Sequence, residues 1–187
     1  MPGHAHGASV AAFVGAWTLM MIPMMLPSLA PVLVRATRPV VVALAYYAVW
    51  AAVGVAVHVG GRVVGPVVPP APWVSGVVVL LAGALQFTRW KRRALAQCHV
   101  VAAGGCPTGS VVAEWRHGLR LGIACVRSCA GPTAVLVALG AMELRVMTAV
   151  AVAITAERLA RRPVVAARIA GAVALGAGVG LLGGAGR

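Results

Sequence analysis

Acidic residues are almost absent from this chain. Three of the 187 residues carry a carboxylate side chain, Glu114, Glu143 and Glu157, and charged residues of both signs make up only 10% of the sequence. So few charges cannot cover the surface of a soluble domain of this length. Three carboxylates are also too few for a carboxylate metal cluster, and the sequence contains no nucleotide-binding loop and no Ser-His-Asp set. The sequence therefore predicts no enzyme active site.

Apolar residues take the place of the missing charges. They make up 61% of the chain, and the mean hydropathy is +0.95. A helix needs roughly 20 apolar residues to cross a bilayer, and six apolar runs of this kind can be marked, at 9–34, 40–60, 73–88, 119–139, 146–159 and 164–183. We therefore expect an all-α fold, a polytopic transmembrane helical bundle of about six spans. It would form a single membrane domain over 1–187, with a cytoplasmic interfacial connection at 89–118.

The net charge of +13 comes from short basic clusters between the apolar runs. This distribution is typical of loops beside a membrane, so it predicts the lipid bilayer as the partner and no nucleic acid. If the spans alternate, twelve Lys and Arg residues fall on one side and three on the other. Because cytoplasmic loops carry the excess of Lys and Arg, we expect a multi-pass protein with both termini outside.

Two cysteines lie within the fourth apolar run. Cys125 and Cys129 are four residues apart, which places both thiols on one face of a helix. Thiolates at this spacing suit a soft metal ion such as Cu(I) or Zn. The alternative is a pair of small buried thiols that only fill space between helices.

Methionines cluster in the first apolar run. Four of the seven fall within six residues, at Met20, Met21, Met24 and Met25. Thioethers are soft, neutral ligands for Cu(I), although methionine is also a common filler of helix interfaces. Pro23 and Pro27 each remove a helix hydrogen bond, which produces either a simple kink or a break that marks a binding site. Counted along the helices, the methionines and the cysteine pair lie at similar depth near the membrane midplane.

One basic residue, Arg127, lies inside the fourth run rather than beside it. An ionisable side chain within a span faces the bundle interior in most membrane proteins and pairs with another polar group. The nearest candidate is Glu157, close to the cytoplasmic end of the fifth run. The sequence therefore predicts a structural ion pair between Arg127 and Glu157.

Three blocks of sequence resemble a bacterial family of predicted metal-binding integral membrane proteins. The first contains Trp17, Leu19, the methionines and the Pro27-Ser28 pair, and the second runs from Gln86 through Lys91 to Cys98. The third block runs from Trp115 through the Cys125-x-x-x-Cys129 motif and Met142 to Glu157-Arg158. The resemblance implies residence in the bacterial inner membrane and a role with a metal ion.

The chain lacks several cysteines of that family. Ala94 stands where the family has the first of two cysteines after the Lys-Arg pair, and Ser128 replaces one of two adjacent cysteines in the fourth run. The sulfur ligands available for an ion are correspondingly fewer.

Two functions follow from these observations. The first is an integral membrane protein that binds or handles a soft metal ion, most simply copper. Its primary ligands would be Met20, Met24, Cys125 and Cys129, with secondary candidates Met21, Met25 and Met142. The alternative is a non-catalytic accessory subunit of a larger, copper-dependent membrane complex, because small loops and many small residues suit close contact with other membrane protein subunits.

Overall fold

The computed structural model describes residues 9–66, 72–105, 110–140 and 143–185, and within these ranges the chain forms seven α-helices and no strand. The helices are α1 (Val10–Leu33), α2 (Pro39–Val64), α3 (Pro72–Leu85), α4 (Arg89–Ala103), α5 (Val111–Leu139), α6 (Leu144–Leu159) and α7 (Pro163–Ala185). Each predicted apolar run overlaps one helix, and α4 occupies the first half of the predicted connection. The all-α fold is confirmed.

Polar caps and glycines set several helix ends. The Ser9 hydroxyl accepts a hydrogen bond from the backbone N–H of Ala12 at the start of α1, and Thr88 does the same for Lys91 at the start of α4. Gly140 ends α5 with a φ of 104°, a conformation that glycine adopts without a steric cost. The α1 helix runs unbroken through Pro23 and Pro27, so the prolines do not interrupt it.

Four of the described helices, α1, α2, α5 and α7, are long and apolar enough to cross a membrane. The α3 and α4 helices add a fifth if they count as one span bent by 66°. The remaining predicted span lies on α6, whose 16 residues extend about 24 Å at 1.5 Å per residue and fall short of a hydrocarbon core of roughly 30 Å. Of the six predicted spans, this geometry supports four or five.

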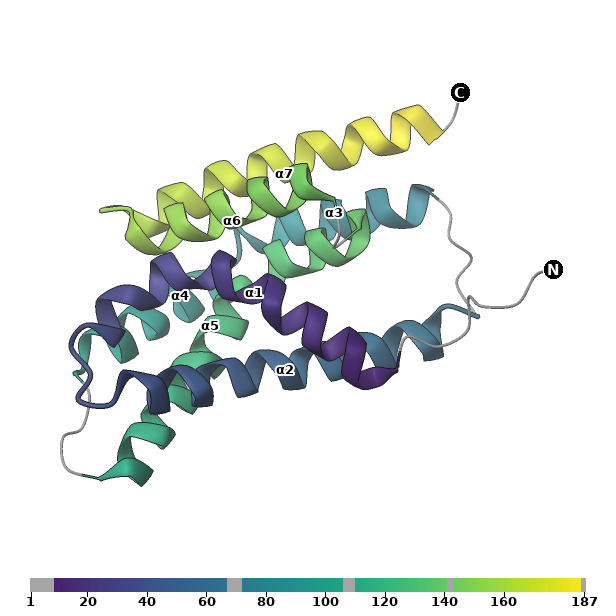
Figure 1. The fold of residues 1–187 in the computed structure, drawn as a ribbon. Helices are drawn as coiled ribbons and strands as arrows, with labels where there is room; N and C mark the ends of the chain where they lie inside the picture. The colour runs from purple at the N-terminus through teal and green to yellow at the C-terminus, as the bar shows by residue number, and fades with distance from the viewer. Residues whose placement is uncertain (1–8, 67–71, 106–109, 141–142, 186–187) are drawn as a thin grey trace.

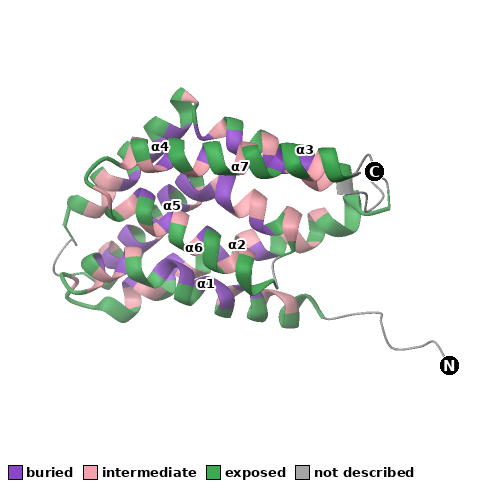
Figure 2. Ribbon diagram, turned by 90° about the horizontal axis from the view of Figure 1, so that it is seen from above, coloured by how far each residue is buried: buried purple, intermediate pink, exposed green. Residues whose placement is uncertain are grey.

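The helices run back and forth along one axis of the bundle. Figure 1 shows α1, α3 and α6 running in one direction and α2, α5 and α7 in the other, so the start of α1 and the end of α7 lie at the same end. The α5 helix is central, because it packs against α2, α3, α4 and α6. Figure 2 shows α5 inside the bundle, with much of its ribbon coloured as buried.

The outer face of the bundle is apolar. Large side chains such as Leu19, Leu44, Leu81 and Val173 are more than half exposed. In water this much exposed apolar surface would favour aggregation, whereas lipid tails solvate it. The interior instead gathers the methionines, the cysteines and the aromatic residues Trp17, Tyr46 and Trp50.

Glycines bring α2 close to its two neighbours. A Cβ atom at Gly54 would lie 2.7 Å from the indole ring of Trp17, so α1 rests directly on the α2 backbone there. On the other side, a Cβ at Gly118 would lie 2.5 Å from the carbonyl oxygen of Val42, and one at Gly122 would collide with Val49. These two close approaches fix α1 and α5 on either side of Tyr46.

Candidate metal centre

Three sulfur atoms meet in the core between α1 and α5. The Sγ atom of Cys125 lies 3.8 Å from Sδ of Met25 and 4.0 Å from Sγ of Cys129. All three side chains are buried, with at most 1% of their surface exposed. The cluster therefore combines two thiols and one thioether in a site closed to solvent.

Local sequence explains why these atoms meet. Four residues separate Cys125 from Cys129, so both thiols project from one face of α5. The α1 helix is held in register by the Trp17 indole, which donates a hydrogen bond to the carbonyl oxygen of Trp50 over 3.1 Å. From α2, the Tyr46 hydroxyl donates a 2.8 Å hydrogen bond to Sγ of Cys125.

The other predicted sulfur ligands lie near this cluster. Met20, Met21 and Met24 are buried in the same core. Among the described methionines, Met25 alone has its sulfur in contact with a cysteine. The structure thus places Met25, one of the secondary candidates, against Cys125. Met142, another secondary candidate, lies outside the described residues.

Arg158 provides a positive charge beside the thiols. Its Nη2 atom donates a 2.9 Å hydrogen bond to Oγ of Ser128 and lies 3.5 Å from Sγ of Cys129. Ser128 occupies the position of a missing family cysteine, and its hydroxyl also donates to the carbonyl oxygen of Cys125. A guanidinium at this place stabilises a negative charge on the Cys129 sulfur.

The predicted ion pair between Arg127 and Glu157 is wrong. Glu157 is buried and pairs with Lys91, whose Nζ lies 2.6 Å from Oε2, while Gln86 donates to its Oε1 atom over 2.7 Å. Arg127 is exposed on the outer face of α5. The error arises because Lys91 looked like a headgroup-facing loop charge, whereas the bend between α3 and α4 turns it into the bundle.

Three residues of the site were not predicted as parts of it. Tyr46 and Arg158 contact the cysteine pair, and Cys98 on α4 is buried close to Arg158 and Ser128. Arg158 and Cys98 do fall in the blocks that carry the family resemblance. The sequence marks Tyr46 only as one of its few aromatic residues, which form 5% of the chain.

The described residues contain no group of three or more His, Cys, Asp and Glu side chains placed to hold a metal ion. The donors that do lie together are the sulfur atoms of Met25, Cys125 and Cys129. Thiolate and thioether donors favour a soft ion over the hard cations, which take oxygen ligands.

The described chain is an all-helical bundle in which four helices are suited to cross a membrane. Its core holds a buried group of sulfur donors. These features define a class of helical bundles suited to a membrane and rich in buried sulfur. Residues 14–181 match a family model described as PpoB2, copper chaperone. The match covers most of the sequence, and the chain belongs to this family. No curated protein and no solved structure matches the chain. The expected link to copper is confirmed at the level of the family.

Proposed function

We propose that this protein is a membrane-integrated copper chaperone that holds Cu(I) between Met25, Cys125 and Cys129. The observation that carries the proposal is the meeting of three buried sulfur atoms at separations of 3.8 and 4.0 Å. Membership of a copper chaperone family supports copper as the cargo.

The spacing of the sulfurs suits a three-coordinate ion. Three sulfurs that each lie about 2.3 Å from a central ion, the usual length of a metal–thiolate bond, stand roughly 4.0 Å apart in a trigonal plane. The two separations that involve Cys125, to Met25 and to Cys129, are close to this value. Cu(I) accepts such a small set of soft donors without any carboxylate.

Buried charge balances when Cu(I) is bound. Two thiolates and one Cu(I) carry a net charge of −1, and the Arg158 guanidinium beside Cys129 offsets it. Lys91 and Glu157 already neutralise each other next to this group. A balanced, hydrogen-bonded arrangement is a condition for keeping charges in an apolar interior.

Further sulfur side chains suggest a route for the ion. Met20, Met21 and Met24 line the interior face of α1, and Cys98 lies on α4. We propose that Cu(I) passes between these soft donors and the cysteine pair, with Met142 as an additional donor. The protein would reside in the plasma membrane with both termini outside.

Copper analysis of the purified protein tests this function. Under reducing conditions the protein should retain about one copper ion per chain, and a Cys125→Ser/Cys129→Ser variant should lose it. A Met25→Leu variant should bind more weakly, whereas Met147→Leu, which changes a half-buried methionine on α6, should not. Unfolding temperatures in detergent control for misfolding. Equal copper in the protein and the double cysteine variant would contradict the proposed site.

A further inference from the structure

Arg127 is an exposed cation in the middle of a helix suited to cross a membrane. It lies on α5 (Val111–Leu139), seven residues beyond Arg120, which corresponds to about 10 Å along the axis. Within the described ranges, Arg127 forms no ion pair and no side-chain hydrogen bond. A guanidinium facing lipid at this depth is unfavourable, and such residues in membrane proteins have a partner.

None of the described carboxylates pairs with Arg127. The three acidic residues of the chain are all described, and two of them face other cations, Glu157 at Lys91 and Glu114 at Arg38. Glu143 is the exposed N-cap residue of α6 and forms no ion pair with any described residue. The described residues therefore provide no counter-charge for Arg127.

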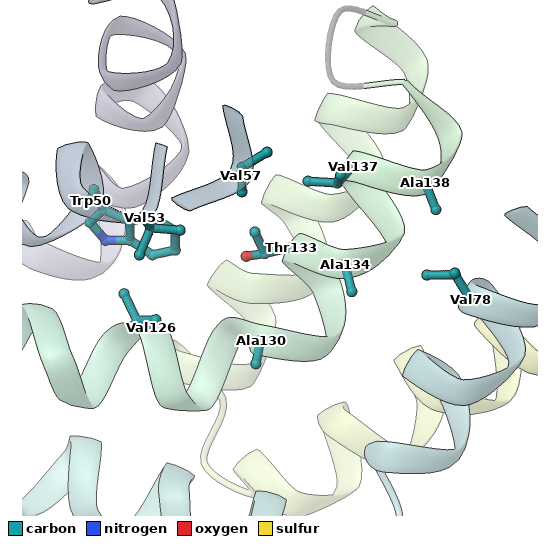
Figure 3. A pocket seen from close by; sticks show the side chains of 10 residues that line it. All are labelled: Trp50, Val53, Val57, Val78, Val126, Ala130, Thr133, Ala134, Val137 and Ala138. Atoms are coloured by element: carbon teal, nitrogen blue, oxygen red, sulfur yellow. The ribbon is translucent and has the colours of Figure 1, made fainter. Parts of the chain in front are cut away.

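An apolar groove lies on the same face of α5, between α2 and α3. It has a volume of about 420 Å³, and Figure 3 shows Val57 and Val78 on opposite sides of the α5 residues. The α5 wall includes Ala130, Ala134 and Ala138 at intervals of one turn. Because Ala130 and Ala134 follow Arg127 by three and seven residues, the cation stands at one end of this wall.

Polar groups are few in the groove. Thr133 adds a hydroxyl to the α5 wall (Figure 3). Trp50 also lines the groove, but its side chain is fully buried and its Nε1 atom is not exposed to the groove. The groove thus offers an apolar surface with one hydroxyl, and Arg127 stands at one end of its α5 wall.

We propose that this groove binds a transmembrane helix of another protein that carries a carboxylate at the level of Arg127. The row of alanines allows the backbone of a second helix to approach closely. A lipid phosphate is less suitable, because phosphates lie at the membrane surface and not at the depth of the α5 centre. A symmetric second copy would bring two Arg127 side chains together. The inference rests on the membrane integration proposed above.

Synthetic helices in vesicles provide the test. Dye-labelled Leu-Ala helices with a central Glu or a central Gln are reconstituted with the labelled protein in phosphatidylcholine vesicles, and energy transfer reports association. The Glu helix should bind about tenfold more tightly than the Gln helix. Arg127→Gln should abolish this preference, whereas Arg120→Gln should retain it. Ala134→Leu should weaken binding of both helices by filling the groove, and Val173→Leu on α7 should not.

The outcomes separate this inference from the proposed function. Loss of the protein from the vesicles in alkaline carbonate would overturn membrane integration and the inference with it. A protein that stays integrated but binds the Glu and Gln helices equally would overturn the inference alone. The same holds if the preference survives Arg127→Gln, or if phosphatidylglycerol vesicles remove it, since a lipid anion would then occupy the site.

Discussion

The cysteine pair of α5 contacts a different neighbour at each sulfur. Cys125 accepts a hydrogen bond from Tyr46 and lies against Met25, whereas Cys129 faces the guanidinium of Arg158. The two thiols are therefore not equivalent. A positive charge beside Cys129 favours its thiolate form, which is the form that binds metal.

Removal of the Arg158 charge should weaken copper binding. We expect Arg158→Gln to lower the Cu(I) affinity by about tenfold or more, because a hydrogen bond from a charged donor to the thiolate is lost. Competition with a chromophoric Cu(I) chelator measures the affinity. Arg161→Gln, at an exposed position three residues further on, should bind like the unaltered protein. An unchanged affinity in Arg158→Gln would show that this guanidinium does not stabilise the bound state.

Part of the candidate site follows from spacing along helices. The shared face of Cys125 and Cys129, and their closeness in depth to the methionines, could be predicted because helical geometry is regular. Which methionine contacts Cys125 could not be predicted, because Met20, Met21, Met24 and Met25 occupy two adjacent faces whose orientation depends on how α1 rests on α2. Arg158 was missed because a basic residue at the end of an apolar run looks like a loop charge.

Whole helices are positioned by a few close contacts. The clearest is at Gly54, where the absence of a side chain leaves room for the Trp17 indole and its hydrogen bond to Trp50. A larger residue there would push α1, and Met25 with it, away from α5. Gly60 lies on the same helix and has no atom within 4 Å of its Cβ position.

These two glycines form a matched pair of substitutions. Gly54→Val should destabilise the protein by roughly 1–3 kcal/mol, because the added atoms overlap a buried ring. Gly60→Val should change stability by less than about 0.5 kcal/mol, because the added Cβ atom meets open space. Denaturant unfolding in detergent micelles measures both. Equal losses would mean that the Trp17 contact does not hold α1 in place.

The buried ion pair connects α4 to α6. Lys91→Met should destabilise the protein by about 3–5 kcal/mol, because it leaves the Glu157 carboxylate without its cation in an apolar interior. The double variant Lys91→Met/Glu157→Met should recover most of this loss, since replacement of both partners by apolar residues is often neutral. The same unfolding assay applies, and a double variant less stable than Lys91→Met would refute this explanation.

The helices themselves could be predicted better than their relative positions. The long apolar runs predict the bounds of α1, α2 and α7 to within about four residues, because apolar side chains continue along the whole length of each helix. The α5 helix begins at Val111, eight residues before its predicted run at 119–139. The apolar runs do not predict which side chains of α4 are buried. Arg89, Arg92 and Arg93 are exposed, as an interfacial helix requires, but Lys91 points inward. That inward turn depends on the 66° bend after α3, which no local sequence pattern specifies.

At the scale of the molecule, the reversal of direction from helix to helix bears on topology. The start of α1 and the end of α7 share one end of the bundle, while α4 and the connections from α1 to α2 and from α6 to α7 lie at the other (Figure 1). Reporter fusions at Gly104 and at the C-terminus should therefore report opposite sides of the membrane, with Gly104 in the cytoplasm because basic residues stay on that side. Reporters found on the same side would require an even number of crossings between Gly104 and the C-terminus, and would contradict this topology.

The contact between α3 and α7 also has a consequence for biosynthesis. The α3 helix packs chiefly against α7, with the backbone of Gly83 against that of Gly171 and Leu80 fitted over Gly178. However, α3 ends at Leu85 and α7 begins only at Pro163. At a translation rate of about 5–20 residues per second, the ribosome completes α3 roughly 4–16 s before α7 begins to appear. The shortest helix of the described fold thus remains without its main neighbour throughout this interval, and the α3–α7 side of the bundle closes only after α7 has been made.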